Sequence, residues 1–249
     1  MLSKSSIKLL QSLKLKKHRQ KYHLFVAEGH KTITTLLSHG TYLLDQLYAS
    51  SDWMAKNNTR VSTSQVIICT KEELKKLSSL KSSPEVLGIF KYEEPDVALV
   101  SHLESAIYLD DVQDPGNVGT IIRIADWYGV DAVIRSRDSA DFYNPKVVQS
   151  TMGSIGHVKL HTVDKCMLRD HLKDWDIIGA VMSSKGSDRT TDKSACLVIG
   201  NEGKGISDEA LGLITHHCHI PGADQRQADS LNAAIAAGIL AQHIWGRQI

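Results

Sequence analysis

The stretch ACLVIGNEGKG, residues 195–205, decides the fold of this chain. Its first five residues form a continuous apolar run of the length that predicts a buried strand. Gly200, Gly203 and Gly205 follow, and glycine permits turns and close backbone approaches that a Cβ would strain. Further along, Ser230, Leu231 and Asn232 open an alanine-rich segment that predicts a helix. We therefore expect a pocket for a small molecule that is walled by main chain.

The chain has 249 residues, which is long for one ordinary core and indicates two domains. An acidic, proline-containing stretch near residues 92–96 separates two apolar runs. We predict a first domain over 1–92, a linker over 93–104 and a second domain over 105–249. In the first domain the patterns predict a small α/β module, with helices over 32–39 and 71–80 and strands over 43–49, over 65–69 and ending at Phe90.

The second domain alternates more cleanly between apolar strands and amphipathic helices. Strands are predicted over 105–110, 131–135, 157–161, 176–182, 195–199 and 216–220. Helices are predicted over 117–128, 145–153, 165–173, 207–214 and 230–246. This order predicts a mostly parallel sheet covered on both faces. Such sheets bind ligands at the carboxyl ends of their strands.

The net charge is only +1, but the positive charge is concentrated in residues 1–31. Glu28 is the one acid there, beside Lys4, Lys8, Lys14, Lys16, Lys17, Arg19, Lys21 and Lys31. A clustered basic segment attracts phosphate groups, which makes a nucleic acid or an acidic membrane surface the leading partner. The alternative is a solvated chain terminus without a partner.

The cysteines do not indicate a metal site or a disulfide framework. Cys69, Cys166, Cys196 and Cys218 are widely separated and form no C-x-x-C pair. The first thirty residues lack the apolar core of a signal peptide, and no window approaches the ~18 apolar residues of a membrane span. We expect a cytoplasmic protein that binds no metal and does not enter a membrane.

A turn, DPGN at 114–117, precedes the first helix of the second domain, and Asn117 is the predicted N-cap. Gly119 and Arg123 are four residues apart and thus neighbours on the helix surface. A bare glycine beside an arginine leaves room for a ribose or a phosphate to meet the guanidinium. Arg123 is therefore our first catalytic candidate, and the alternative is an exposed arginine paired with Asp126.

Three stretches resemble the ordered motifs of the SpoU/TrmH family of RNA ribose methyltransferases, namely NVGTIIRIA (117–125), LVIGNEGKGIS (197–207) and SLNAAIAAG (230–238). HRQKYHLFVAEGHKTITTLL (18–37) resembles the accessory RNA-binding domain of that family. The resemblance implies a parallel-sheet α/β domain with a deep trefoil knot, preceded by a small ribosomal-protein-like α/β domain. It also implies S-adenosylmethionine as cofactor, a homodimer, and an RNA substrate, with ribosomal RNA favoured over transfer RNA by the accessory domain.

The resemblance also assigns roles by position. It implies a catalytic set of Asn117, Arg123, Glu202, Ser230 and Asn232. It implies cofactor contacts from Met182, Gly200, Gly205, Ile220 and Leu231. In the basic N-terminal segment we expect RNA contacts from Lys14, Lys16, Lys17, Arg19 and Glu28. Because arginine stays protonated, we expect Arg123 to hold the oxyanion and a phosphate, and the proton acceptor stays open.

Several features of the sequence admit more than one interpretation. The loop 222–229 is longer and more polar than the family pattern, which leaves its cofactor contacts undefined. The apolar stripe of helix 230–246, capped by Ser230, suits a core helix as well as a dimer contact. A dinucleotide-binding dehydrogenase is disfavoured because Gly116-x-x-Gly119 lacks the G-x-G-x-x-G spacing. A transfer-RNA methyltransferase and a non-catalytic RNA-binding protein of the same fold both stay open.

Overall fold

A computed structural model describes residues 2–57, 61–93, 102–180 and 194–246. The chain divides into two compact units by its internal contacts. The first unit is Met1–Glu93 together with Asp141–His157, and the second is Glu94–Ala140 together with Val158–Ile249. Most of the predicted linker lies outside the described residues, so the domain limits 1–92, 93–104 and 105–249 stay a prediction.

The first unit is built on a four-stranded sheet in the order β1-β4-β2-β3. Its strands are β1 (Leu24–Glu28), β2 (Leu43–Ala49), β3 (Val66–Ile68) and β4 (Val86–Lys91). Strand β4 is antiparallel to both β1 and β2, and β3 is parallel to β2. Its helices are α1 (Lys4–Ser12), α2 (Lys16–Tyr22), α3 (His30–His39), α4 (Ser51–Lys56), α5 (Lys71–Leu77) and α7 (Pro145–Thr151), with 3₁₀ turns at Thr63–Gln65 and Ser154–Gly156.

Both faces of this sheet are covered by helices. Helices α1 and α5 bury Leu10, Leu13, Leu74 and Leu77 on the face that carries Val26, Tyr48, Leu87 and Ile89. Because side chains alternate along a strand, Phe25 and Phe90 point to the opposite face. Helix α3 packs there, with Ile33 next to Gly88 of β4. Because β1 is buried on both faces, its sequence does not alternate between apolar and polar residues, the pattern that would identify it as a strand.

The segment 141–157 completes the core of the first unit, although it lies between two strands of the second unit along the chain. Tyr143 stacks on Tyr92 with ring centroids 3.8 Å apart and lies 5.1 Å from Phe25. Helix α7 packs against β1. Burial raises the pKa of Tyr42, the neighbour of Tyr143, to about 12. These aromatic side chains form a closely packed cluster.

Arg19 joins three parts of the first unit from a buried position, with 2% of its side chain exposed. Its Nη1 donates to the carbonyl oxygens of Leu13 and Lys14, each at 2.9 Å, just after α1 ends. Its Nε donates to Asp141 Oδ2 at 3.0 Å and Nη2 lies 2.5 Å from the same oxygen. The guanidinium therefore binds the segment 141–157 to the helical N-terminus of the chain.

The second unit contains a six-stranded sheet in the order β10-β8-β9-β5-β6-β7, with all neighbours parallel. Its strands are β5 (Ser105–Leu109), β6 (Ala132–Arg135), β7 (Lys159–Thr162), β8 (Asp176–Ala180), β9 (Ala195–Ile199) and β10 (His216–Cys218). Its helices are α6 (Pro115–Tyr128), α8 (Lys165–His171), α9 (Asp208–Leu211) and α10 (Ala233–Trp245). The predicted parallel α/β sheet is confirmed.

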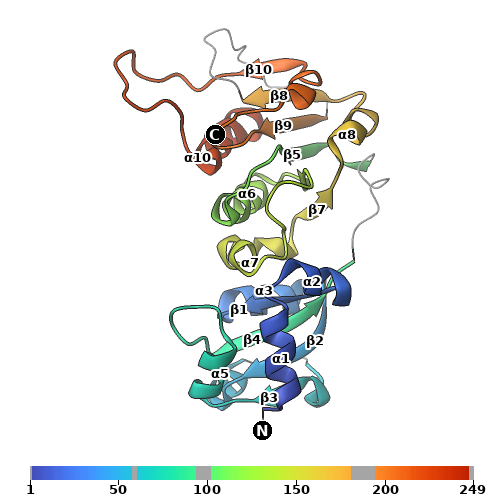
Figure 1. Ribbon diagram of the computed structural model, residues 1–249, viewed down its shortest axis with the longest axis vertical. Coiled ribbons are helices and arrows are strands. Elements are labelled where there is room, and N and C mark those ends of the chain that lie inside the picture. The colour runs from blue at the N-terminus through green and yellow to red at the C-terminus, as the bar shows by residue number, and fades with distance from the viewer. Residues whose placement is uncertain (1, 58–60, 94–101, 181–193, 247–249) are drawn as a thin grey trace. The chain divides into compact units, whose positions relative to one another are not determined.

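Helices cover both faces of the six-stranded sheet (Figure 1). Helices α8 and α9 contribute Leu168, Leu172 and Ala210 to a core with Tyr108, Ile134 and Val198 of the sheet. Helices α6 and α10 pack against each other on the other face. Strand β9 lies between β8 and β5, which explains why all five of its residues are buried. The carboxyl end of β9 leads directly into the glycine-rich loop.

Two predicted helix starts are wrong, and side-chain chemistry gives the reason. Asp114 caps α6 instead of Asn117, because its Oδ1 accepts from the amides of Gly116 at 2.6 Å and Asn117 at 3.0 Å. Pro115 occupies the first helical position, where a missing N–H costs nothing. Asn232 caps α10 instead of Ser230, because its Oδ1 accepts from the amides of Ala234 and Ile235.

We predict that Asp141→Ala destabilises the first unit. The substitution leaves the Arg19 guanidinium buried without its carboxylate, which should lower the free energy of unfolding by about 3 kcal/mol or more. Urea denaturation measures the change. Asp138→Ala, at an exposed aspartate, is the control and should shift stability by no more than ~0.5 kcal/mol. Equal stability of the two variants would contradict the anchoring role of Arg19.

Candidate cofactor pocket and active site

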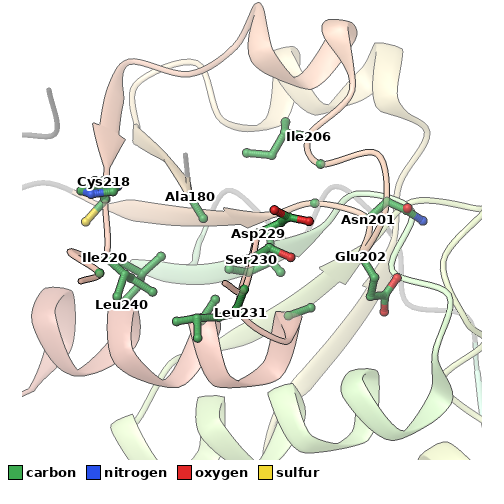
Figure 2. Close-up of a pocket in the computed structure, with 18 of the residues that line it drawn as sticks. Ala180, Asn201, Glu202, Ile206, Cys218, Ile220, Asp229, Ser230, Leu231 and Leu240 are labelled. Carbon is green, nitrogen blue, oxygen red and sulfur yellow. The ribbon is translucent and has the colours of Figure 1, made fainter. Parts of the chain in front are cut away.

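A pocket of about 460 Å³ opens where β8, β9 and β10 end (Figure 2). The strand ends contribute Ala180, Ile199 and Cys218 to its lining. Two loops, 200–206 and 219–222, and the approach to α10 close around it. The volume lies in the range of small-molecule sites, and the position is the carboxyl edge at which parallel sheets bind ligands.

The glycine-rich loop 200–206 folds back on itself through two backbone hydrogen bonds between Asn201 and Gly205, at 2.9 and 3.0 Å. A Cβ on Gly200 would lie only 2.4 Å from backbone atoms of Gly205 and Ile206, so no other residue fits. Gly205 has φ of +72°, in the left-handed region that favours glycine. Gly203 has neither constraint, since the atom closest to a Cβ added there would be Asn201 Oδ1, at a distance of 3.7 Å.

The pocket is lined by apolar side chains and by polar main-chain groups. Apolar side chains reach it from several elements, namely Ile199, Ile206, Ile220, Leu231 and Leu240, most of which are labelled in Figure 2. The predicted cofactor residues Gly200, Gly205, Ile220 and Leu231 all line this pocket. Met182, the fifth, lies outside the described residues. Part of the loop 222–229 also lines the pocket, through Gly222, Arg226, Ala228 and Asp229.

Asn117 connects residues from three distant parts of the sequence. Its Nδ2 donates to Glu202 Oε1 at 2.9 Å, and its Oδ1 accepts from Asn232 Nδ2 at 2.9 Å. Asn117 is buried, while Glu202 lines the pocket and Asn232 begins α10. Because both ends of its amide are engaged, the side chain has a single orientation. Ser230 also lines the pocket, beside Leu231.

Arg123 does not join this group. Its side chain is exposed on α6, and within the described ranges no ion pair or hydrogen bond holds it, including one to Asp126. Gly119, the glycine expected to leave room beside it, is buried in α6, and that expectation stays a prediction. The guanidinium is instead available to a ligand from solvent.

The predicted RNA contacts in the first unit divide into two groups. Lys14, Lys16 and Lys17 are exposed around the start of α2. Arg19 is buried against Asp141, and Glu28 is buried as well. Glu28 Oε1 accepts from the Ser79 amide at 2.9 Å and Oε2 accepts from the Ser78 hydroxyl. Charge patterning identified the basic segment but does not distinguish a solvated cation from a buried one.

The described part of the chain shows no cluster of metal-ligating side chains. No group of three His, Cys, Asp or Glu side chains there is placed to hold a metal ion. Cys69, Cys196 and Cys218 are buried, and burial raises the pKa of Cys69 to about 11. In the same residues, no helix is both long and apolar enough to cross a membrane.

Residues 104–242 match the model of the SpoU rRNA Methylase family, and residues 4–88 match the MRM3-like substrate binding domain. The fold and the site thus define an RNA methyltransferase. The chain belongs to the SpoU rRNA methylase family.

Relatives and solved structures resemble the chain over nearly its whole length. It is 26% identical to the 23S rRNA (guanosine(2553)-2'-O)-methyltransferase RlmP of Bacillus subtilis, over 96% of this chain and 100% of the relative. A putative RNA methyltransferase of the TrmH family from Porphyromonas gingivalis matches with a TM-score of 0.85, 31% identity and 98% of both chains. The SpoU methyltransferase AviRb from Streptomyces viridochromogenes, solved in complex with AdoMet, matches with a TM-score of 0.84, 25% identity and 97% of both chains.

We predict that Gly200→Ala weakens ligand binding in the pocket, because its Cβ would collide with the Gly205 and Ile206 backbone. Titration with S-adenosylmethionine should show affinity at least about tenfold weaker, equal to about 1.4 kcal/mol. Gly203→Ala is the matched control in the same loop and should bind within about twofold of the wild type. Equal losses in both variants would contradict the close contact at Gly200.

Proposed function

We propose that this methyltransferase binds S-adenosylmethionine in the pocket and transfers its methyl group to a ribose 2′-hydroxyl, in ribosomal RNA. The observation that carries the proposal is the hydrogen-bonded chain Glu202–Asn117–Asn232, which brings the three family motifs together beside the glycine-rich loop. The family description, the name of RlmP and the AdoMet complex of AviRb support it.

The residues present fit this cofactor. Ile199, Ile206 and Leu240 offer apolar surface for an adenine ring, and the folded loop 200–206 leaves its backbone beside the pocket. Gly200, Gly205, Ile220 and Leu231 would hold it mainly through main-chain groups. S-adenosylmethionine supplies an electrophilic methyl group on a sulfonium. Methyl transfer then requires an aligned nucleophile in a partly desolvated site more than covalent catalysis.

Arg123 is the proposed oxyanion anchor. A ribose 2′-hydroxyl is a poor nucleophile until its developing negative charge is stabilised, and a guanidinium stays protonated while it does so. Arg123, which is exposed and has no ion pair among the described residues, can receive that oxygen together with a neighbouring RNA phosphate. Asn117 holds the Glu202 carboxylate at the pocket and is itself held by Asn232, while Ser230 adds a hydroxyl to the pocket lining.

The first unit is the proposed RNA-binding module. Its match to a substrate binding domain and the exposed Lys14, Lys16 and Lys17 support this role. Buried Arg19 and Glu28 shape the module from within instead of contacting RNA. A ribosomal RNA substrate agrees with the cytoplasmic location expected from the sequence.

We also propose a homodimer formed through α6 and α10. Trp127 of α6 is 82% exposed, and Ile235 and Ile239 of α10 are 56% and 45% exposed. The two helices pack together, so these side chains extend an apolar surface that water otherwise covers. A monomer in sedimentation at micromolar concentration would contradict the dimer.

We further propose that the carboxyl-terminal part of the second unit is knotted, as the family resemblance implies. The support is the strand order β10-β8-β9-β5-β6-β7 and the shared lining of one pocket by the loops 200–206 and 219–222 and by α10. Deep threading is rare among protein chains, which makes the proposal specific. An experimental structure in which the chain closes without threading would overturn it.

We predict that Arg123→Ala folds and binds S-adenosylmethionine like the wild type but transfers methyl groups at least about 100-fold more slowly, as expected for the loss of one oxyanion donor. Labelled methyl donor and total RNA from a strain lacking the protein provide the assay, with mapping of 2′-O-methyl positions. Arg169→Ala, at an exposed arginine of α8, is the control and should keep full activity. Unchanged activity of Arg123→Ala would refute the assigned role.

We predict that replacing Lys14, Lys16 and Lys17 together by alanine weakens RNA binding most at low salt. If each lysine contacts one phosphate of single-stranded RNA, the slope of log K against log salt should fall by about 2 in total. The matched control replaces three exposed lysines of α5, Lys71, Lys75 and Lys76, which removes the same charge. Equal weakening by both triple variants would mean that overall charge, and not the segment around α2, determines binding.

A further inference from the structure

Lys165, Asp110 and Asp111, here called the Lys165 cluster, form an ion-paired group outside the pocket lining. Lys165 begins α8, and its Nζ lies 3.0 Å from Asp110 Oδ1 and 2.7 Å from Asp111 Oδ2. The two aspartates directly follow β5, and the Asp110 side chain is only 1% exposed. Glu209 is a distant fourth member, with its carboxylate 4.0 Å from Nζ and 74% exposed.

The two aspartates hold both ends of the glycine-rich loop. Asp110 Oδ2 accepts from the Ser207 amide at 2.6 Å, where the loop ends and α9 begins. The Asp111 carbonyl accepts from Asn201 Nδ2 at 2.8 Å, where the loop begins. Asn201 in turn uses its Oδ1 to accept from the amides of Gly203 and Lys204. The loop that carries Glu202 is thus fixed to the residues after β5 at two points.

The position of Asp111 is itself constrained. Its φ is +60°, a left-handed conformation that few residues other than glycine, asparagine and aspartate adopt. Ser136 holds it there, because the Ser136 hydroxyl donates to Asp111 Oδ1 at 2.8 Å and accepts from the Asp111 amide at 3.0 Å. This conformation turns the Asp111 carbonyl toward Asn201.

The charge of Lys165 stabilises this arrangement of carboxylates. Apart from the Lys165 ammonium at 3.0 Å, Asp110 Oδ1 has no hydrogen-bond donor among the described residues, so this ammonium is its main source of stabilisation. Two adjacent carboxylates, one of them fully buried, repel each other strongly in a medium of low dielectric constant. Burial lowers the pKa of Lys165, but its contacts with the carboxylates of Asp111 and Asp110 outweigh burial and raise the pKa overall, so the ammonium stays charged.

We propose that Lys165 is a positioning residue for the cofactor pocket, because it holds Asp110 and Asp111 in the geometry that fixes the loop 200–206. Within the described ranges Lys165 is not part of the pocket lining and has no ion pair or hydrogen bond to the proposed catalytic residues, and it acts through Asn201 and Ser207. The inference rests on the proposed function, since it concerns the affinity for S-adenosylmethionine. The proposal adds to the site a residue of α8 that lies outside the three sequence motifs.

Calorimetric titration with S-adenosylmethionine tests the proposal in the full-length protein. Lys165→Met keeps the aliphatic chain and removes the charge, and we expect binding at least about tenfold weaker, equal to about 1.4 kcal/mol. Lys173→Met, at an exposed lysine just after α8, is the control and should bind within about twofold of the wild type. Binding of Lys165→Met within the same limit would overturn the proposal.

Asp111→Asn gives a second test that does not depend on the folding of Lys165→Met. Asparagine tolerates the left-handed conformation, so the variant should fold and bind the cofactor severalfold more weakly. The double variant should bind no more weakly than Lys165→Met alone, because the two residues act through one link. An unchanged affinity of Asp111→Asn, or losses that multiply in the double variant, would overturn the proposal.

Hydrogen exchange separates loop positioning from general destabilisation, and it needs no ligand. In Lys165→Met, or in Asp111→Asn should the former not fold, the amides of residues 200–207 should exchange faster while those of β5 stay protected. Faster exchange throughout the sheet with no excess in the loop would overturn the proposal. If the wild-type protein binds no S-adenosylmethionine, the proposed function fails, and the exchange measurement still decides the role of Lys165.

Discussion

The amide of Asn117 is the interaction on which the site depends. It is the one side chain that contacts both Glu202, in the glycine-rich loop, and Asn232, at the start of α10, among the residues described. A buried amide that makes one bond as donor and one as acceptor cannot rotate without losing both. This amide therefore fixes the relative positions of three elements, namely the start of α6, the loop after β9 and the N-terminus of α10. The pocket forms between the last two.

The loop 200–206 shows how little side-chain chemistry this pocket needs. Gly200 is required because backbone atoms occupy the space of a side chain, and Gly205 because of its left-handed conformation. The remaining constraints come from Asn201 and from the two aspartates after β5. Rigidity here comes from main-chain contacts and buried charge, which permits the loop to present its own backbone to a ligand without a large loss of entropy on binding.

Local patterns in the sequence predict the second unit well. Continuous apolar runs identify β5 and β9, and three motifs bring Asn117, Glu202 and Asn232 to one site. The failures have physical causes. Strand β1 is buried on both faces and shows no alternation, and Arg19 reads as a surface cation because its partner, Asp141, lies 122 residues further along the chain. The Lys165 cluster is missed for the same reason, since a lysine becomes structural only through partners brought close by the fold.

The inclusion of residues 141–157 in the first unit has a consequence for biosynthesis. The aromatic cluster around Phe25 and Tyr143, and the ion pair of Arg19 with Asp141, cannot form until the chain has been made beyond Tyr143. By then β5 and β6 of the other unit have already been translated. The first unit therefore cannot finish folding as an independent nascent domain. Its last contacts form only after the first strands of the parallel sheet have been synthesised.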